Sequence, residues 1–279
     1  MILSFGSTAE GAAFPWALAV PALAALVAYA VAAMLPQQGD RAVRASLVIA
    51  WLAHAGSIAI DTTGLGSDET GARFGFAPAL SVTLWLVIGV YLVESRLLPL
   101  TGVRRALALL GAVAVALAAM FPGEHPQVDS RWEPLHWVTG IATYGLFGVA
   151  VLHAAMLNRA DRQMRQPPQH SSASPAALGL PLLHLERLTF RFVMAGFVVL
   201  TATLVLGWWF ANPWQWDHKK VFSILAWVVF AALLAGRRAF GWRGPVATRW
   251  LYAGTGLLLL AYVGSRFVFE VVLHRPPVA

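Results

Sequence analysis

The segment from Leu188 to Phe210 reads Leu-Thr-Phe-Arg-Phe-Val-Met-Ala-Gly-Phe-Val-Val-Leu-Thr-Ala-Thr-Leu-Val-Leu-Gly-Trp-Trp-Phe, and its one charged residue is Arg191. About 20 apolar residues in a helix cross the hydrocarbon core of a bilayer. An isolated segment in lipid satisfies its backbone hydrogen bonds only as a helix. This stretch therefore predicts a transmembrane helix.

Seven further apolar segments follow the same pattern. The predicted fold is therefore an all-α, polytopic integral membrane protein with eight transmembrane helices, and residues 1–279 form a single membrane domain. The eight predicted helices are Phe14–Leu35, Val43–Ile60, Phe76–Leu98, Arg104–Phe121, Pro134–Leu157, Leu188–Phe210, Val221–Ala235 and Ala247–Val272.

The composition agrees with this assignment. Of the 279 residues, 58% are hydrophobic and 12% are charged, whereas soluble domains are about 45–50% apolar and about 25% charged. These values exclude an ordinary soluble enzyme, a disordered chain and a coiled coil. The sequence has no cysteine, which excludes disulfides, thiolate metal sites and thiol redox relays.

The basic residues are spread among the ends of the apolar segments. The net charge is +7, but no single basic patch forms, so we predict no nucleic-acid partner. With the N-terminus outside, 14 of the 20 Lys and Arg residues fall in inside loops and 6 fall outside. Inside loops of membrane proteins are enriched in Lys and Arg. The distribution predicts that both termini lie outside.

One inside segment has the composition of a linker. Residues 158–181 include Gln-Pro-Pro-Gln-His-Ser-Ser-Ala-Ser-Pro. Such a segment has too few apolar side chains to order its backbone by burial. We predict a flexible cytoplasmic loop without chemistry of its own.

Polar residues within a membrane are costly, so the histidines are informative. His54 lies at mid-depth in its helix, where it either bonds to another helix or serves as a haem ligand or proton relay. His136, His218 and His274 are all predicted at the outer face, in three separate segments, where two of them would suffice to ligate a haem iron. The other histidines are predicted to be structural or solvated: His125, His153, His170 and His184.

The segment between Gly207 and Lys220 is rich in tryptophan. Interfacial tryptophans are common in membrane proteins, where one or two rings at a helix end contact the lipid headgroups. Four tryptophans in nine residues, followed by Asp217-His218-Lys219-Lys220, are more than such an interface requires. Such a surface suits a planar apolar macrocycle whose propionates pair with Lys or Arg.

The run Trp214-Gln-Trp216-Asp217-His218-Lys219 resembles the tryptophan-rich signature of the cytochrome c assembly family, the haem-handling membrane proteins of the CcsA and CcmC type. Trp214, Trp216, Asp217 and Lys219 match the signature. The match extends over residues 130–274, which would form the haem-handling core. The chain departs from the signature at two positions, since His218 replaces a proline and Lys220 replaces an acid. In these departures it resembles the CcsA-like, YpjD- and HemX-type proteins of the bacterial inner membrane.

The resemblance implies a haem held at the outer face by His136 and His274, with His54 as a further haem histidine within the membrane. It implies a non-enzymatic protein whose partners are haem, apocytochrome c, other cytochrome c assembly proteins and the lipid bilayer. Two alternatives stay open. One is a small-molecule transporter that uses His54, and the other is a membrane regulator or assembly factor of haem metabolism.

Overall fold

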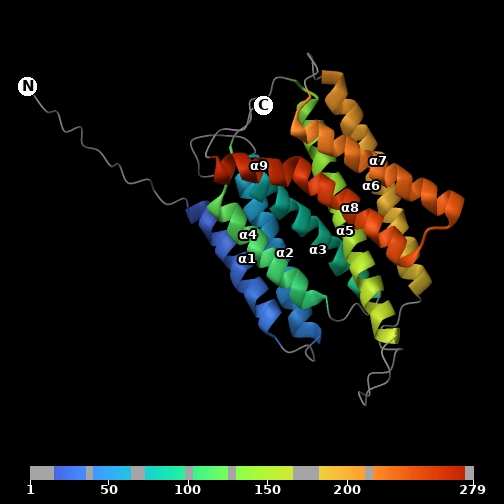
Figure 1. Ribbon diagram of the computed structural model, residues 1–279. Coiled ribbons are helices and arrows are strands. Elements are labelled where there is room, and N and C mark those ends of the chain that lie inside the picture. The colour runs from blue at the N-terminus through green and yellow to red at the C-terminus, as the bar shows by residue number, and fades with distance from the viewer. Residues whose placement is uncertain are drawn as a thin grey trace, which may run out of the picture.

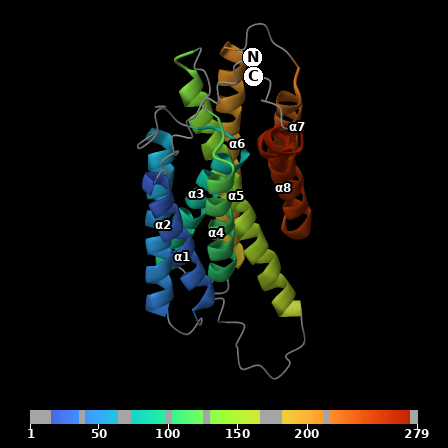
Figure 2. The ribbon, with the colours of Figure 1, turned by 90° about the vertical axis from the view of Figure 1, so that its left-hand side faces the viewer.

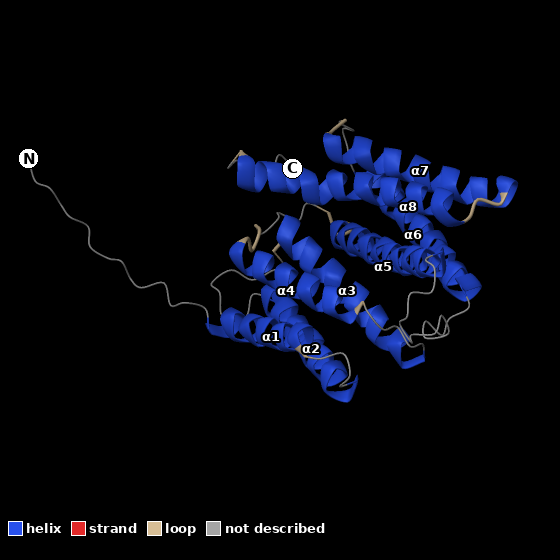
Figure 3. Cartoon of the chain, turned by 60° about the horizontal axis from the view of Figure 1, so that its bottom comes forward, coloured by secondary structure: helices blue, strands red, loops and turns tan. Residues whose placement is uncertain are grey.

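The computed structural model describes residues 16–35, 40–63, 73–97, 103–124, 130–165, 182–210 and 216–273. Throughout these ranges the regular structure is helical, and the one bridge of β type joins Phe74 to Glu124 (Figure 3). The helices are α1 (Trp16–Met34), α2 (Asp40–Thr63), α3 (Phe76–Leu97), α4 (Arg104–Met120), α5 (Glu133–Arg165), α6 (Leu182–Phe210), α7 (His218–Phe240) and α8 (Gly244–Leu259), which continues through a π turn (Leu260–Gly264), α9 (Ser265–Phe267) and a second π turn (Val268–Val272). The all-α prediction is confirmed.

The helices form two groups that meet at α5. Helices α1 to α4 pack around one apolar core, in which Tyr29, Leu47 and Ile88 are fully buried. Helices α5 to α8 pack around a second core that contains Phe147, Phe230 and Leu251. Figures 1 and 2 show α5 beside α6, with α1 to α4 on one side and α7 and α8 on the other. The two groups are therefore joined mainly through the contact of α3 with α5.

Six described helical segments are long and apolar enough to cross a membrane: Arg41–Thr63, Phe76–Ser95, Glu133–Arg162, Leu183–Trp209, His218–Phe240 and Gly244–Val272. The apolar part of α1, Ala19–Met34, is shorter. Helix α4 has 17 residues, which at about 1.5 Å per residue is close to the lower limit for a span. Many apolar side chains on these helices are exposed on the isolated chain, as a lipid-facing surface requires.

Several predicted boundaries were wrong, and α6 begins at Leu182 rather than at Leu188. Helix α7 begins at His218 and ends at Phe240, eight residues longer than the predicted Val221–Ala235. Asp217 caps its first turn and Gly241, at φ 66°, ends it in the left-handed conformation, so the basic residues near both ends lie within the helix. Hydropathy alone places these residues outside.

The segment predicted as a loop from residue 158 also begins as helix. Helix α5 continues to Arg165, because this stretch still has helix-forming residues with one buried side, where Ala160 is 6% exposed. The Arg162 Nε donates to the Asn158 carbonyl over 3.2 Å. Residues 166–181 lie outside the described residues.

Polar side chains inside the bundle are paired between helices. Trp51 on α2 and Trp85 on α3 each donate from the indole Nε1 to the other's backbone carbonyl, at 3.0 and 3.1 Å, with their rings stacked 4.9 Å apart. His153 on α5 is fully buried, and its Nε2 lies 2.7 Å from an oxygen of Glu94 on α3. This imidazole–carboxylate contact crosses the boundary between the two helix groups.

Glycine allows a close approach of α8 to α7 at Gly254. Phe230 stacks on Phe147 with ring centroids 3.8 Å apart, and a Cβ at Gly254 would lie 2.7 Å from the Phe230 ring. Because Phe230 is fully enclosed, its ring has no room to move away.

We predict that Gly254→Ala lowers stability by about 1–3 kcal/mol, the usual effect of overpacking a core. Gly256→Ala is the matched control on the same helix, because a Cβ there meets no atom within 4 Å. Thermal unfolding of both variants in detergent measures the difference. Equal melting temperatures for Gly254→Ala and Gly256→Ala would contradict this packing.

Candidate functional site

His136 lies in the first turns of α5, and its ring packs against α6. The Nδ1 atom is 3.0 Å from the backbone carbonyl oxygen of Thr203. One turn further along α6, a Cβ at Gly207 would lie 3.0 Å from the His136 ring. The absence of a side chain at Gly207 therefore makes room for the imidazole between the two helices.

The Thr203 carbonyl fixes the tautomer of His136. A carbonyl oxygen only accepts hydrogen bonds, so Nδ1 carries the proton and donates it. In the neutral ring the lone pair then resides on Nε2. This is the arrangement of metal-binding histidines, whose second nitrogen usually donates to a carbonyl or carboxylate.

An exposed aromatic surface lies at the same end of the bundle. Figures 1 and 2 show that α5 begins, α6 ends and α7 begins at this end. Trp208 and Trp209 follow Gly207 on α6 with 66% and 75% of their surface exposed, and Trp216 before α7 is 70% exposed. Indoles exposed to this degree are costly in water, so these three rings are suited to contact lipid or a flat apolar ligand.

The residues of the tryptophan-rich run have distinct structural positions. Asp217 is the N-cap of α7, and its Oδ1 accepts a hydrogen bond of 2.7 Å from the backbone N–H of Lys220. His218 is exposed in the first turn of α7. Lys219 is half-buried and lies within electrostatic range of Asp217 and of Arg266 on α9. Asp217 thus orients the start of the helix that carries the two lysines.

The last helical segment is irregular, with one π turn before α9 and one after it. Such turns are rare and are frequent at functional sites. Within this segment Arg266 and Glu270 form an ion pair at 3.6 Å, as the i,i+4 spacing predicts. The Glu270 carboxylate also accepts a hydrogen bond from the backbone of Phe76 at the start of α3. It thereby attaches this segment to the first helix group.

Two predicted site residues, His274 and Trp214, lie outside the described residues, so the pairing of His136 with His274 stays a prediction. Described helix in this region ends at Val272, two positions before His274. The part of the chain that the structure describes contains no group of three or more His, Asp or Glu side chains placed to hold a metal ion. A haem iron needs at most two protein ligands beyond the porphyrin, so this finding does not bear on haem.

His54 is fully buried between three helices, and hydroxyl groups contact both of its ring nitrogens. Its Nδ1 is 3.0 Å from the Tyr29 hydroxyl on α1, and its Nε2 is 2.7 Å from the Ser81 hydroxyl on α3. This is the geometry expected for the interhelical hydrogen-bond alternative. His54 belongs to the core of α1 to α4, whereas His136 contacts α6.

The comparisons with known proteins agree with the tryptophan-rich run and the helical architecture. The family model described as "Cytochrome C assembly protein" matches residues 18–273. The chain belongs to the cytochrome c assembly protein family. The match includes the first four helices, which precede the residues 130–274 that carry the sequence resemblance.

Similar proteins include a YpjD and a CcsA. The inner membrane protein YpjD of Escherichia coli K12 is 31% identical over 270 residues, which cover 90% of this chain and 98% of that protein. The cytochrome c biogenesis protein CcsA of Prochlorococcus marinus MIT 9515 is 33% identical over 166 residues, covering 51% of this chain and 53% of that protein. No solved structure matches the chain. As a member of this family with several apolar spans, the protein is a multi-pass protein of the inner membrane.

Several residues at these sites were not predicted from sequence. Thr203 contributes through its backbone carbonyl, which has no signal in the residue type. Gly207 was visible as a glycine before two tryptophans, but only the fold places it against His136. Tyr29 and Ser81 were likewise missed as partners of His54, because they lie 25 and 27 positions from it in the sequence.

We predict that His54→Ala removes the hydrogen-bond partner of two buried hydroxyls and lowers stability by about 1–3 kcal/mol. His184→Ala, an exposed histidine of α6, is the control and should leave the melting temperature unchanged. Thermal unfolding in detergent is the measurement. An unchanged melting temperature for His54→Ala would show that its hydrogen bonds are not structural.

Asp217 acts as a helix cap in this structure, and Asn caps helices about as well as Asp. We therefore expect Asp217→Ala to lower stability by about 1 kcal/mol and Asp217→Asn to retain it. Unfolding in detergent and the helical circular dichroism signal of both variants provide the test. If Asp217→Asn lost as much stability as Asp217→Ala, the charge rather than the cap would be the stabilising feature.

Proposed function

We propose that this protein is a haem-binding, haem-handling membrane protein that supports cytochrome c assembly. Haem is held at the outer face, beside the tryptophan-rich run. Membership of the cytochrome c assembly family supports the general role. The names of the similar CcsA proteins, which state a part in cytochrome c biogenesis, support it further.

The observation that carries the proposal is the hydrogen bond from His136 Nδ1 to the Thr203 carbonyl. It orients the ring and places the proton on Nδ1, so Nε2 is the nitrogen that would ligate the iron. Because both partners lie on long packed helices, the ring is held before any ligand arrives. We propose His274 as the second axial ligand, with His218 as the nearby alternative in the first turn of α7.

The remaining residues supply the surroundings of a porphyrin. Trp216 and Trp214 provide apolar rings for its faces. Lys219 provides a cation for a propionate, and Asp217 holds the helix start on which Lys219 lies. His54 would be a second, deeper haem position only if its hydroxyl contacts are exchanged for the iron, so we place it second to His136.

In this proposal the protein makes and breaks no covalent bond. Haem supplies the iron and the vinyl groups, and the protein binds it, orients it and presents it at the outer surface. Covalent attachment in c-type cytochromes uses the cysteines of the recipient chain, and this sequence has none. The expected protein partners are apocytochrome c and other cytochrome c assembly proteins.

The proposed topology has eight spans with both termini outside. It is supported by the eight helical regions, by the arginines at the α6 start, α7 end and α8 start, and by the inside enrichment of basic residues in membrane proteins. In this orientation His136, Trp216 and Lys219 face the outer side.

Haem binding is tested by titrating the purified protein with haemin and following the Soret band. We expect His136→Ala to weaken haem binding more than about tenfold. Loss of a residue that only orients a metal-binding side chain already lowers metal affinity by about 10–100-fold. Added imidazole should restore a six-coordinate spectrum. His184→Ala is the control. Wild-type binding by both His136→Ala and His274→Ala would refute the proposed ligands.

The topology is tested with single cysteines, because the natural chain has no background thiol. We expect a membrane-impermeant maleimide to label His218→Cys in spheroplasts and Arg238→Cys only after the membrane is permeabilised. Both positions are exposed, so labelling reports sidedness. The opposite labelling pattern would invert the orientation and move the proposed haem site to the cytoplasmic face.

A further inference from the structure

Two cations lie close together at the end of the bundle that carries His136. Lys219 is half-buried in the first turn of α7, and Arg266 on α9 lies within electrostatic range of it. The Arg266 side chain is only 16% exposed. Two like charges that are partly withdrawn from water repel each other, so this arrangement is costly unless an anion joins them.

The two carboxylates of this cluster are each paired with a different cation. An oxygen of Glu270 lies 3.6 Å from Arg266 Nη1, and an oxygen of Asp217 lies 3.4 Å from Lys220 Nζ. Lys219 forms no ion pair with another described side chain. The Arg266 Nε is buried and has no hydrogen-bond acceptor within the described ranges. The cluster therefore has one cation more than it has carboxylates.

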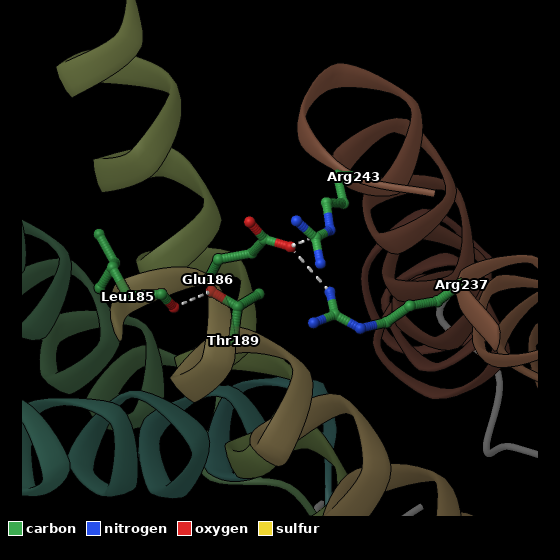
Figure 4. A network of polar contacts seen from close by, with 5 residues as sticks. All are labelled: Leu185, Glu186, Thr189, Arg237 and Arg243. Atoms are coloured by element: carbon green, nitrogen blue, oxygen red, sulfur yellow. Dashed lines mark hydrogen bonds and ion pairs between the residues drawn. The ribbon is translucent and has the colours of Figure 1, made fainter. Parts of the chain in front are cut away.

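The ion pairs at the opposite end of the bundle are in closer contact with water. Glu186 on α6 accepts a hydrogen bond of 3.0 Å from Arg237 on α7, and Arg243 lies 3.5 Å from the same oxygen (Figure 4). The Arg243 side chain is 66% exposed, so water solvates this second positive charge. Lys219 and Arg266 are less exposed. A bound anion would therefore stabilise them more than it would stabilise Arg243.

Aromatic contacts connect Arg266 with the candidate haem site. The next residue, Phe267, packs edge-on against Phe76 with ring centroids 5.4 Å apart. Two positions before Phe76, the Phe74 ring contacts Trp137 on α5 with centroids 4.5 Å apart. Trp137 directly follows the histidine that we propose as the axial ligand. The cation cluster and this histidine therefore belong to the same end of the bundle, whichever side of the membrane that end faces.

A ligand that suits the cluster has a carboxylate attached to a flat apolar body. Guanidinium and ammonium groups bind carboxylates through charge-assisted hydrogen bonds. Trp216, three residues before Lys219, is 70% exposed and offers an apolar ring beside the cations. Haem combines the two features, because both of its propionates leave the same edge of the porphyrin.

We propose that Lys219 and Arg266 together bind one propionate of haem, and that Glu270 positions Arg266 for this contact. The inference rests on the proposed haem site at His136 and adds Arg266 to it. Glu270 also accepts a hydrogen bond from the backbone of Phe76, so Arg266 is held against the first helix group before haem binds. The two cations thereby determine which edge of the porphyrin lies at α7 and α9.

The test compares haemin with haemin dimethyl ester, in which both propionates are uncharged and the iron is the same. Each is titrated into the purified full chain in detergent, and the Soret band is followed. We expect the wild type to bind haemin about tenfold more tightly than the ester, the effect of one charge-assisted hydrogen bond. Arg266→Gln and Lys219→Gln should each weaken haemin binding by about tenfold and leave ester binding unchanged.

Three further comparisons separate the cluster from other causes. His136→Ala should weaken the binding of haemin and of the ester alike, because it acts on the iron. Arg131→Gln removes a positive charge from an exposed residue just before α5 and should change neither affinity. Lys219→Gln leaves the Arg266–Glu270 ion pair in place, so it decides the test if Arg266→Gln fails to fold.

The inference is overturned if the wild type binds haemin and the ester equally well. It is also overturned if the folded cluster variants bind haemin like the wild type, or if Arg131→Gln weakens haemin binding as much as they do. In each of these cases the wild type still binds haemin, so the proposed function stands. Binding of neither compound by the wild type would instead refute the haem site itself, and this inference with it.

Discussion

The hydrocarbon core of a bilayer offers no hydrogen-bond partner, so a polar group placed there must be satisfied by the protein itself. Several contacts between the described helices answer this constraint. Trp51 and Trp85 exchange bonds through each other's carbonyls, His54 contacts two hydroxyls, and His153 contacts Glu94. Each contact joins different helices. The polar side chains that are costly in lipid are therefore also the ones that fix how the apolar helices align.

The same constraint explains the position of the candidate haem site. His136 lies near a helix end, where its Nδ1 donates to a backbone carbonyl of α6. The exposed rings of Trp208, Trp209 and Trp216 lie at that end. The opposite end has the arginines, with Glu186 shared between two of them. The two ends of one bundle thus differ, with exposed tryptophans beside two lysines at one end and a group of arginines at the other.

Much of the fold was predictable because hydropathy reports directly on lipid burial. The eight apolar segments became eight helical regions, and the tryptophan-rich run predicted the family correctly. The ends of helices were less predictable. The basic residues at both ends of α7 lower its hydropathy, yet the Asp217 cap and the left-handed Gly241 determine where it begins and ends. The partners of the site residues could not be predicted at all, since the Thr203 carbonyl and the space at Gly207 depend on how α5 packs against α6.

The central claim is that an ordered imidazole at the outer face holds haem. The most direct measurement is the absorption spectrum of the purified protein, reconstituted with haemin, in its oxidised and dithionite-reduced forms. We predict a sharp Soret band and, on reduction, resolved α and β bands, which indicate six-coordinate haem. A spectrum equal to that of free haemin in the same detergent would contradict the claim and leave the family fold without its proposed ligand.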